Sequence, residues 1–251
     1  MIVNESNPLP EFKVQFPEWD KLRMQILPNY VYQVIPSYPI TWEFLHERGV
    51  GNSFLYWLLF SSEFSNAVAL AGGSLRKLFN PQEEIQDYDL FIDPTGLSTL
   101  CGMMYRLADK YEDKGCAHEF IIKGVKYQVI PFVGSASALA DSFDFTINSQ
   151  VVKHGHLKTP FWDAIQRGLP ISNLIFTQSS KALLEHFPLQ EGTIKFRVRL
   201  FQRMLKFLIQ GYKAPSSTRD KLTAYVERHK VVNNIPRAVV SAALRTDSSN
   251  G

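Results

Sequence analysis

The stretch that decides the fold is AGGSLRKLFNPQEEIQDYDLFID, from Ala71 to Asp93. It joins a glycine turn to two carboxylates two residues apart, Asp87 and Asp89, in an apolar run that predicts a strand over 88–92. Residues two apart on a strand point to the same face, so we expect both carboxylates to project from one side. Two like charges that close require a cation or a proton between them, and a hard divalent cation prefers oxygen ligands. The pair is therefore a candidate metal site.

A glycine turn lies upstream of this pair. Gly72, Gly73 and Ser74 follow the apolar run Ala67–Ala71, which predicts a buried strand, and precede a short predicted helix over 75–79. Glycine lets a phosphate approach the backbone, and the free N–H groups at the start of a helix favour an anion. One segment thus predicts a phosphate cradle beside a metal site.

Two motifs carry a resemblance to a known family. An apolar strand, Gly-Gly-Ser and then Asp-x-Asp resembles the signature of the nucleotidyltransferase superfamily that includes DNA polymerase beta. The nearest likeness is to the poly(A) polymerase and CCA-adding tRNA nucleotidyltransferase branch, because Arg76 completes that branch's Gly-Gly-x-x-Arg turn. Asp144 to Asn148 reads DFTIN and matches the branch's Arg-Asp-Phe-Thr-Ile-Asn segment, with Phe143 in place of the arginine.

The resemblance implies a fold and an activity. The fold is α+β, a mixed sheet with flanking helices plus a C-terminal helical region, and the activity moves a nucleoside monophosphate from a nucleoside triphosphate to an acceptor hydroxyl, releasing pyrophosphate. Mg²⁺, with Mn²⁺ as the alternative ion, is the implied cofactor at Asp87 and Asp89. The implied catalytic residues are Asp87, Asp89 and Asp144. The implied nucleotide-binding residues are Gly72, Gly73, Ser74, Arg76, Lys181, Arg199 and Arg203.

One position departs from the family pattern. The runs 118–122 and 125–132 predict a hairpin that turns at Lys123-Gly124. In the superfamily a third carboxylate often stands on such a strand, and Gln128 takes that place here. Either two aspartates suffice, or Asp141 or Asp144 contributes, or activity is weakened. We expect a strand over 143–152 with Asp144, Thr146 and Asn148 on its polar face; for Asp144 a bracing role in the cleft wall is the alternative.

Charge is unevenly distributed along the chain. The net charge is only +3, but residues 193–251 hold 12 basic and 3 acidic residues. Such asymmetry indicates contact with a polyanion, and a solvated basic helix face is the alternative. The segment 193–212 predicts a helix on which Arg199, Arg203 and Lys206 share a face. It resembles the arginine-rich helix ending in Gly-Phe or Gly-Tyr of CCA-adding enzymes, so RNA, with a tRNA-like 3′ end, is the expected acceptor.

The chain is predicted to have three parts: an N-terminal aromatic and proline-rich arm and helix over 1–60, a nucleotidyltransferase core over 61–165, and a basic helical region over 166–251. Further helices are expected over 97–114, 177–187 and 217–229, and a disordered tail over 246–251. We interpret Cys101 and Cys116 as buried reduced thiols, which favours a cytoplasmic protein. No signal core or membrane span is expected, and the arm is a candidate surface for a protein partner.

Several other residues have a structural interpretation that we favour over a functional one. His154 and His156 have metal-ligand spacing but no evident third ligand, so an exposed turn is favoured. Trp57 and Trp162 are expected in the core. Two other functions remain open: transfer to a protein side chain or small molecule, as in toxin-like relatives, and a non-catalytic binding or scaffold module on the same fold.

Overall fold

The computed structural model of the chain describes residues 8–16, 21, 34–186 and 191–220. Its centre is an eight-stranded sheet with strand order β1-β8-β7-β2-β3-β6-β5-β4. Neighbouring strands are antiparallel except β3 and β6, which are parallel. The strands are β1 (Ser37–Pro39), β2 (Ala69–Ala71), β3 (Tyr88–Ile92), β4 (Lys110–Asp113), β5 (His118–Ile122), β6 (Val125–Pro131), β7 (Val151–Lys153) and β8 (His156–Lys158).

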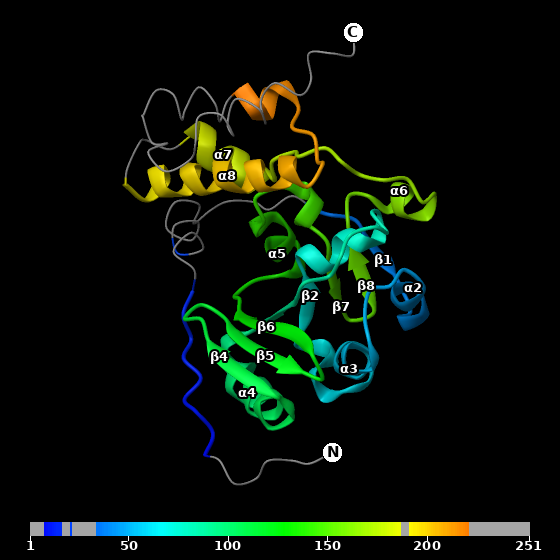
Figure 1. Cartoon of the computed structure of the whole chain (residues 1–251), viewed down its shortest axis with the longest axis vertical. Coiled ribbons are helices and arrows are strands. Elements are labelled where there is room, and N and C mark those ends of the chain that lie inside the picture. The colour runs from blue at the N-terminus through cyan, green and yellow to red at the C-terminus, as the bar shows by residue number, and fades with distance from the viewer. Residues whose placement is uncertain (1–7, 17–20, 22–33, 187–190, 221–251) are drawn as a thin grey trace.

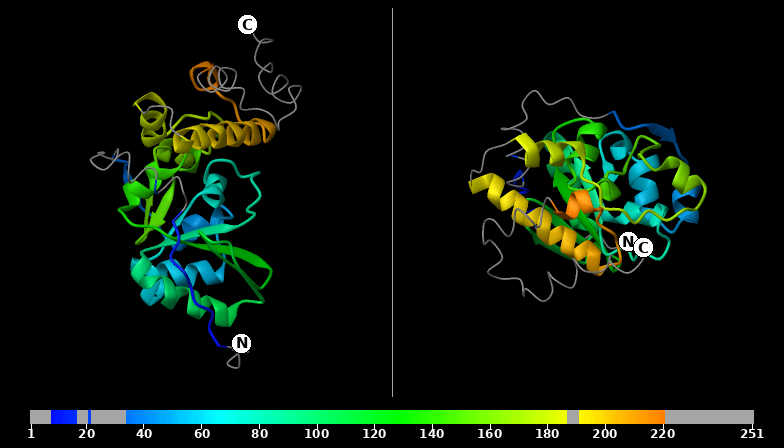
Figure 2. Two further views of the ribbon diagram at one scale, coloured as in Figure 1. Left: turned by 90° about the vertical axis from the view of Figure 1, so that its left-hand side faces the viewer. Right: turned by 90° about the horizontal axis from the view of Figure 1, so that it is seen from above.

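Helices cover the two ends of this sheet. In Figure 1, α7 and α8 lie together across the top of the molecule and α4 lies below β4 and β5. The turned view in Figure 2 shows α8 crossing the same end. The α-helices are α2 (Trp42–Glu47), α3 (Ser53–Tyr56), α4 (Pro94–Leu107), α5 (Ala136–Ser142), α6 (Trp162–Gln166), α7 (Gln178–His186) and α8 (Glu191–Ile209). Shorter turns are the π-helix η1 (Trp57–Ser61) and the 3₁₀ helices η2 (Glu63–Asn66), η3 (Gly73–Leu78) and η4 (Thr146–Asn148). The mixed α+β fold class predicted from the sequence is confirmed.

The strand that carries the acidic pair forms where the sequence predicts it. In β3 the side chains of Tyr88, Leu90 and Ile92 are buried, while Asp89 and Phe91 are half-buried on the opposite face. This alternation fixes the register, because a slip of one residue would bury the carboxylate face.

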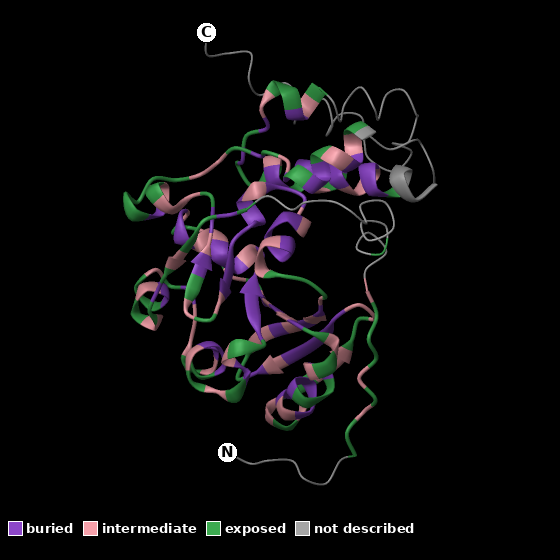
Figure 3. Cartoon of the chain, turned by 180° about the vertical axis from the view of Figure 1, so that it is seen from behind, coloured by how far each residue is buried: buried purple, intermediate pink, exposed green. Residues whose placement is uncertain are grey.

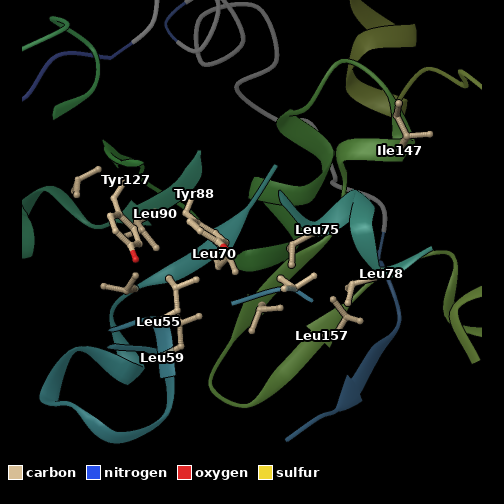
Figure 4. Packing of buried hydrophobic residues seen from close by; sticks show 14 of the residues in the cluster. Leu55, Leu59, Leu70, Leu75, Leu78, Tyr88, Leu90, Tyr127, Ile147 and Leu157 are labelled. Atoms are coloured by element: carbon tan, nitrogen blue, oxygen red, sulfur yellow. The ribbon is translucent and has the colours of Figure 1, made fainter. Parts of the chain in front are cut away.

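A large hydrophobic core packs against the sheet, and a smaller cluster lies around Ala71, Leu139 and Val151. In Figure 3 the segments coloured as buried lie mainly in the middle of the sheet. Figure 4 shows Leu55 and Leu59 packed near Leu70, Leu90 and Tyr127, so residues before position 60 share the core of the sheet. The exact limits of the predicted three parts stay a prediction.

The prediction of one helix over 97–114 is wrong at both ends. Helix α4 already begins at Pro94, because the Asp93 carboxylate accepts a hydrogen bond from the Thr95 N–H at 3.0 Å and proline suits the first helical position. It ends at Leu107, and the chain then pairs as β4 with β5. Sheet pairing overrides the helical spacing of these residues.

The predicted strand over 143–152 is also wrong for most of its length. Only Val151–Lys153 forms a strand, and Thr146–Asn148 forms a 3₁₀ turn. The backbone before the turn bonds to a distant segment: Thr146 N–H donates to the Ile175 carbonyl at 2.8 Å. Asp144 and Asn148 therefore do not share a strand face.

Several smaller predictions have mixed outcomes. Cys101 is buried, whereas Cys116 is only partly so. Trp162 packs against the core and stacks on Tyr38 with ring centroids 4.4 Å apart. Trp57 is wrong as a core residue, because 38% of it is exposed on an apolar groove between α3 and α4. His154 and His156 lie exposed at the β7–β8 turn, as expected.

Some predictions concern residues that lie outside the described ranges. Most of the expected helix over 217–229 and all of the tail over 246–251 lie outside the described residues, as does much of the N-terminal arm. Within the described ranges, none of the helices has the length and apolar character needed to cross a bilayer.

Candidate active-site cleft

The glycine turn forms one wall of a cleft of about 290 Å³ between the sheet and α8. Gly72 follows β2 with φ +84°, a conformation that side chains with a Cβ rarely adopt. A Cβ at this position would lie 2.6 Å from the Asp89 carboxylate oxygen Oδ2. Glycine is therefore required both for the turn and for its close approach to Asp89.

Ser74 adds an unsatisfied polar group to this wall. Its side chain is 3% exposed, and its Oγ has no hydrogen-bond partner among the described residues. A buried hydroxyl without a partner is unfavourable, so a ligand that offers one fits here. Ser74 lines the cleft together with Gly72 and Gly73.

The two carboxylates lie side by side in the cleft. Asp87 directly precedes β3 and Asp89 lies within it, and both side chains line the cleft. Burial and, second to it, the nearby Asp87 charge raise the pKa of Asp89 to about 7, while Arg203 and Arg76 oppose the shift. Removing water from a carboxylate beside another negative charge favours the protonated form.

This pair fits a hard divalent cation. A cation between Asp87 and Asp89 would offset the burial and the repulsion that raise the Asp89 pKa, and carboxylate oxygens are the ligands that Mg²⁺ and Mn²⁺ take. The described part of the chain has no cluster of three or more His, Cys, Asp or Glu residues suited to a metal. The fit therefore rests on two carboxylates.

Two polar residues, Gln128 and Glu119, lie on the strands next to the acidic pair, and only Gln128 was identified from the sequence. Gln128 on β6 pairs with Asp89 across the parallel strands and with Glu119 across the β5–β6 hairpin. Its Nε2 donates to Asp87 Oδ2 at 3.2 Å and to Glu119 Oε2 at 3.4 Å. Glu119 was missed, although the hairpin turn predicted at Lys123-Gly124 already places residue 119 opposite residue 128.

Arg76 holds the turn to other elements of the fold. Its guanidinium donates to both carboxylate oxygens of Glu83, at 3.2 and 3.3 Å, and to Asn148 Oδ1 at 2.9 Å. Tyr212 also donates to Glu83, and Asn80 Nδ2 donates to the Tyr212 hydroxyl at 3.0 Å. Burial and the hydrogen bond to Glu83 raise the pKa of Tyr212. Arg76 thus lines the cleft with its donors engaged by protein groups.

Helix α8 supplies the basic wall. Four residues on one face line the cleft, at the i, i+3, i+4, i+7 spacing of a single helix face: Arg203, Lys206, Phe207 and Gln210. Lys206 is exposed and makes no ion pair with the described residues. It is the cation best placed to meet a ligand.

Asp144 pairs with this helix. Its carboxylate is 1% exposed and lies 2.6 Å from Arg203 Nη1 and 3.8 Å from Arg199 Nη2. The pair joins the DFTIN segment to α8. Asp141, the other aspartate weighed as a third carboxylate, accepts hydrogen bonds from the Gln178 and Ser179 N–H groups at 3.0 and 3.2 Å and so caps α7.

The structure brings together most, but not all, of the predicted site residues. The cleft is lined by Gly72, Gly73, Ser74, Arg76, Asp87, Asp89 and Arg203. Asp144 and Arg199 stand behind Arg203, and Lys181 is exposed on α7 away from the lining. Cleft residues outside the predicted set include Glu83, Gln128, Asn148, Lys206, Phe207 and Gln210.

Comparison with known proteins identifies the fold. No protein-family model and no curated protein matches the sequence. Solved structures described as a CCA-adding enzyme with CTP and with ATP match with TM-scores of 0.55 and 0.56, at 15% and 17% identity, over 84% of this chain. The Thermotoga maritima CCA-adding enzyme complexed with tRNA matches with a TM-score of 0.56 at 17% identity over 84% of this chain.

The chain spans about half of these structures, 50%, 51% and 50% of their lengths. At such identities the likeness establishes a shared fold. The chain therefore has the nucleotidyltransferase fold found in CCA-adding enzymes, as the glycine turn and the DFTIN segment predicted.

Proposed function

We propose that this chain is a nucleotidyltransferase that moves a nucleoside monophosphate from a nucleoside triphosphate to an acceptor hydroxyl, with an RNA 3′ end as the acceptor. One observation carries the proposal: the buried, unpartnered Ser74 hydroxyl and the acidic pair Asp87 and Asp89 line the same cleft. The shared fold supports it, since the similar structures are described with CTP, ATP and tRNA.

The reaction replaces one phosphorus–oxygen bond with another. The acceptor hydroxyl oxygen attacks the α-phosphorus and forms a new ester bond, the bond from that phosphorus to the bridging oxygen breaks, pyrophosphate leaves, and the hydroxyl proton is lost to solvent. Positioning and charge neutralisation carry such a transfer, because the protein has no covalent step to perform.

Each wall of the cleft has a part in this positioning. Asp87 and Asp89 are the residues that would hold Mg²⁺ or Mn²⁺, which when bound makes the attacking hydroxyl more acidic and neutralises the triphosphate. The Ser74 hydroxyl and the N–H groups of Gly73 and Ser74 would donate to phosphate oxygens. Lys206 adds positive charge on the facing wall.

Other predicted residues orient the groups that line the cleft. Arg76, engaged by Glu83 and Asn148, positions the glycine turn rather than reaching out to a phosphate. Asp144 positions Arg203, whose guanidinium lines the cleft. Arg199 supports the same carboxylate at 3.8 Å. Arg76, Asp144 and Arg199 are therefore positioning residues for the cleft.

The acceptor class is inferred from charge. The segment 193–251 carries the excess of 12 basic over 3 acidic residues, and phosphate contacts supply most non-specific affinity for nucleic acids. Helix α8 brings this charge to the cleft through Arg203 and Lys206. A tRNA-like 3′ end is the acceptor we favour.

The test is transfer of label from each α-³²P-labelled triphosphate to total RNA with Mg²⁺, beside the isosteric double variant Asp87→Asn, Asp89→Asn. Label entering RNA with the unchanged protein and lost in the variant is the expected result. If the label instead enters a protein or a small molecule, that molecule and not RNA is the acceptor. If no acceptor is labelled and triphosphate binding does not depend on Mg²⁺, the fold serves as a non-catalytic module.

A further inference from the structure

Asp87, just before β3, Gln128 on β6 and Glu119 on β5 form a hydrogen-bonded row. Asp89 and Gln128 are partners across β3 and β6, and Gln128 and Glu119 are partners across β6 and β5. Partners in register project to the same face of a sheet. The row therefore continues the acidic pair of the cleft into the hairpin.

The Gln128 amide is the link in this row. A primary amide nitrogen has two donor hydrogens, and Nε2 lies 3.2 Å from Asp87 Oδ2 and 3.4 Å from Glu119 Oε2. An ionised carboxylate only accepts, so both neighbours select the amide nitrogen and fix which way the amide faces. The amide separates two like charges and orients each of them.

The Glu119 side chain is buried and contacts both Gln128 and Lys126. It is 8% exposed, and its other close partner is Lys126, whose Nζ lies 3.6 Å from Oε2. Lys126 is 41% exposed and reaches Glu119 from solvent. Glu119 thus has two candidate tasks: an ion pair within the hairpin, or an acceptor that holds the Gln128 amide.

We propose that Glu119, acting through Gln128, is a positioning residue that fixes the orientation of the Asp87 carboxylate. The torsion that turns a carboxylate about its last bond is broad, so a donor on Oδ2 restricts it. Among the described residues, Gln128 is the hydrogen-bond donor to Asp87. With Oδ2 held, Oδ1 is the oxygen presented for a cation.

The functional consequence rests on the function proposed above. Hydrogen bonds to a ligating carboxylate orient it, and loss of such a partner lowers metal affinity by about tenfold or more. Glu119 does not line the cleft and would act only through Gln128. Its replacement should therefore weaken metal binding without removing any group that touches the metal.

The experiment compares Mn²⁺ affinity, measured by the electron paramagnetic resonance of free Mn²⁺, across Glu119→Met, Gln128→Met, Glu119→Gln and Lys126→Met. Glu119→Met and Gln128→Met should each weaken binding by about tenfold, and the double variant should be no worse than either. Glu119→Gln keeps an acceptor and should bind normally. Lys126→Met breaks only the ion pair and should also bind normally. Thermal unfolding confirms that each variant is folded.

Two outcomes would overturn the inference: normal Mn²⁺ binding by folded Glu119→Met, or an equal loss in Lys126→Met. A second readout separates this from failure of the proposed function. The side-chain amide signal of Gln128 in a ¹⁵N spectrum should shift in Glu119→Met and in Asp87→Asn but not in Lys126→Met. If the signal behaves so while the unchanged protein binds no Mn²⁺, the positioning row stands and the proposed function fails.

Discussion

Arg76 Nη1 donates a 2.9 Å hydrogen bond to Asn148 Oδ1, and this bond ties the glycine turn to the DFTIN segment 72 positions along the chain. The same guanidinium pairs with Glu83, which also accepts a hydrogen bond from Tyr212, three residues after the end of α8. The two sequence motifs thus meet at one arginine, and the basic helix is anchored to the same group.

Replacing this arginine should destabilise the fold. Arg76→Met removes three hydrogen bonds and leaves the partly buried Glu83 without its cation, so we expect the free energy of unfolding to fall by about 2–3 kcal/mol. Arg48→Met is a matched control, because Arg48 donates one hydrogen bond, to the Phe44 carbonyl at 3.2 Å. Urea unfolding of both variants measures the difference; equal losses would contradict the network.

Gly72 should resist substitution more than a second glycine of similar conformation. Gly72→Ala meets the Asp89 carboxylate at 2.6 Å, whereas Gly124 has φ +75° and nothing within 4 Å of an added Cβ. We expect backbone strain to lower the free energy of unfolding by about 1 kcal/mol in Gly124→Ala, and the added clash to lower it clearly more in Gly72→Ala. Urea unfolding tests stability, and Mn²⁺ affinity should fall only for Gly72→Ala. Matching unfolding energies would refute the clash.

The acidic pair should make stability depend on pH. The pKa of Asp89 is about 7 in the folded chain against a reference of 3.8, so between these values the folded state holds the extra proton. Stability then falls as pH rises through this window. Asp89→Asn removes this dependence. Without divalent ions, the free energy of unfolding of Asp89→Asn relative to that of the unchanged protein should therefore increase by about 2–4 kcal/mol between pH 4 and pH 8.

The measurement is urea unfolding of both proteins across this pH range in the presence of a chelator. Adding Mg²⁺ at pH 8 should stabilise the unchanged protein and leave Asp89→Asn nearly unaffected. A constant difference between the two proteins at every pH would show that the Asp89 pKa is not raised.

Asp144 should matter more for stability than an exposed ion-paired aspartate. Asp144→Asn removes the negative charge that Arg203 meets at 2.6 Å, and because 40% of the Arg203 side chain is exposed to water we expect a loss of about 1.5–2 kcal/mol in the free energy of unfolding. Asp220 pairs with Arg219 at 3.7 Å with 71% of its side chain exposed, so Asp220→Asn should cost less than about 0.5 kcal/mol. Thermal or urea unfolding distinguishes them, and a small effect of Asp144→Asn would remove its bracing role.

Two lysines allow the triphosphate contact to be assigned. Lys206 lines the cleft, whereas Lys181 is exposed on α7. Lys206→Met should raise the KM for the triphosphate by about tenfold, which is the loss of about 1.4 kcal/mol of binding, while stability stays unchanged. Lys181→Met is the comparison; a larger effect there would restore Lys181 as the contact.

The local pattern of residues was enough to predict the elements of the segment that carries the acidic pair. The apolar run over 88–92 predicted strand β3, and the spacing of Asp87 and Asp89 predicted that both project from one side of it. The hairpin over 118–132 followed from its turn residues. These predictions succeeded because each depends on contacts close in sequence, where a period of two or a glycine with positive φ leaves few alternatives.

Predictions failed where distant segments compete for the backbone. The polar alternation of residues 143–152 suggested a strand, yet Thr146 bonds to Ile175 and Asp144 pairs with Arg203 on α8. Likewise, residues 110–113 continue a helical spacing but pair with β5 instead. Periodicity in the sequence does not indicate which partner strand or helix is within reach.

The sequence by itself therefore determined the glycine turn, the acidic pair and the class of fold, because short-range sterics and alternation specify them. Only the tertiary structure decided how the site is assembled. Packing across 72 positions joined Arg76 to Asn148, the parallel pairing of β3 with β6 placed the Gln128 amide beside Asp87, and the docking of α8 set Lys206 in the cleft while leaving Lys181 outside.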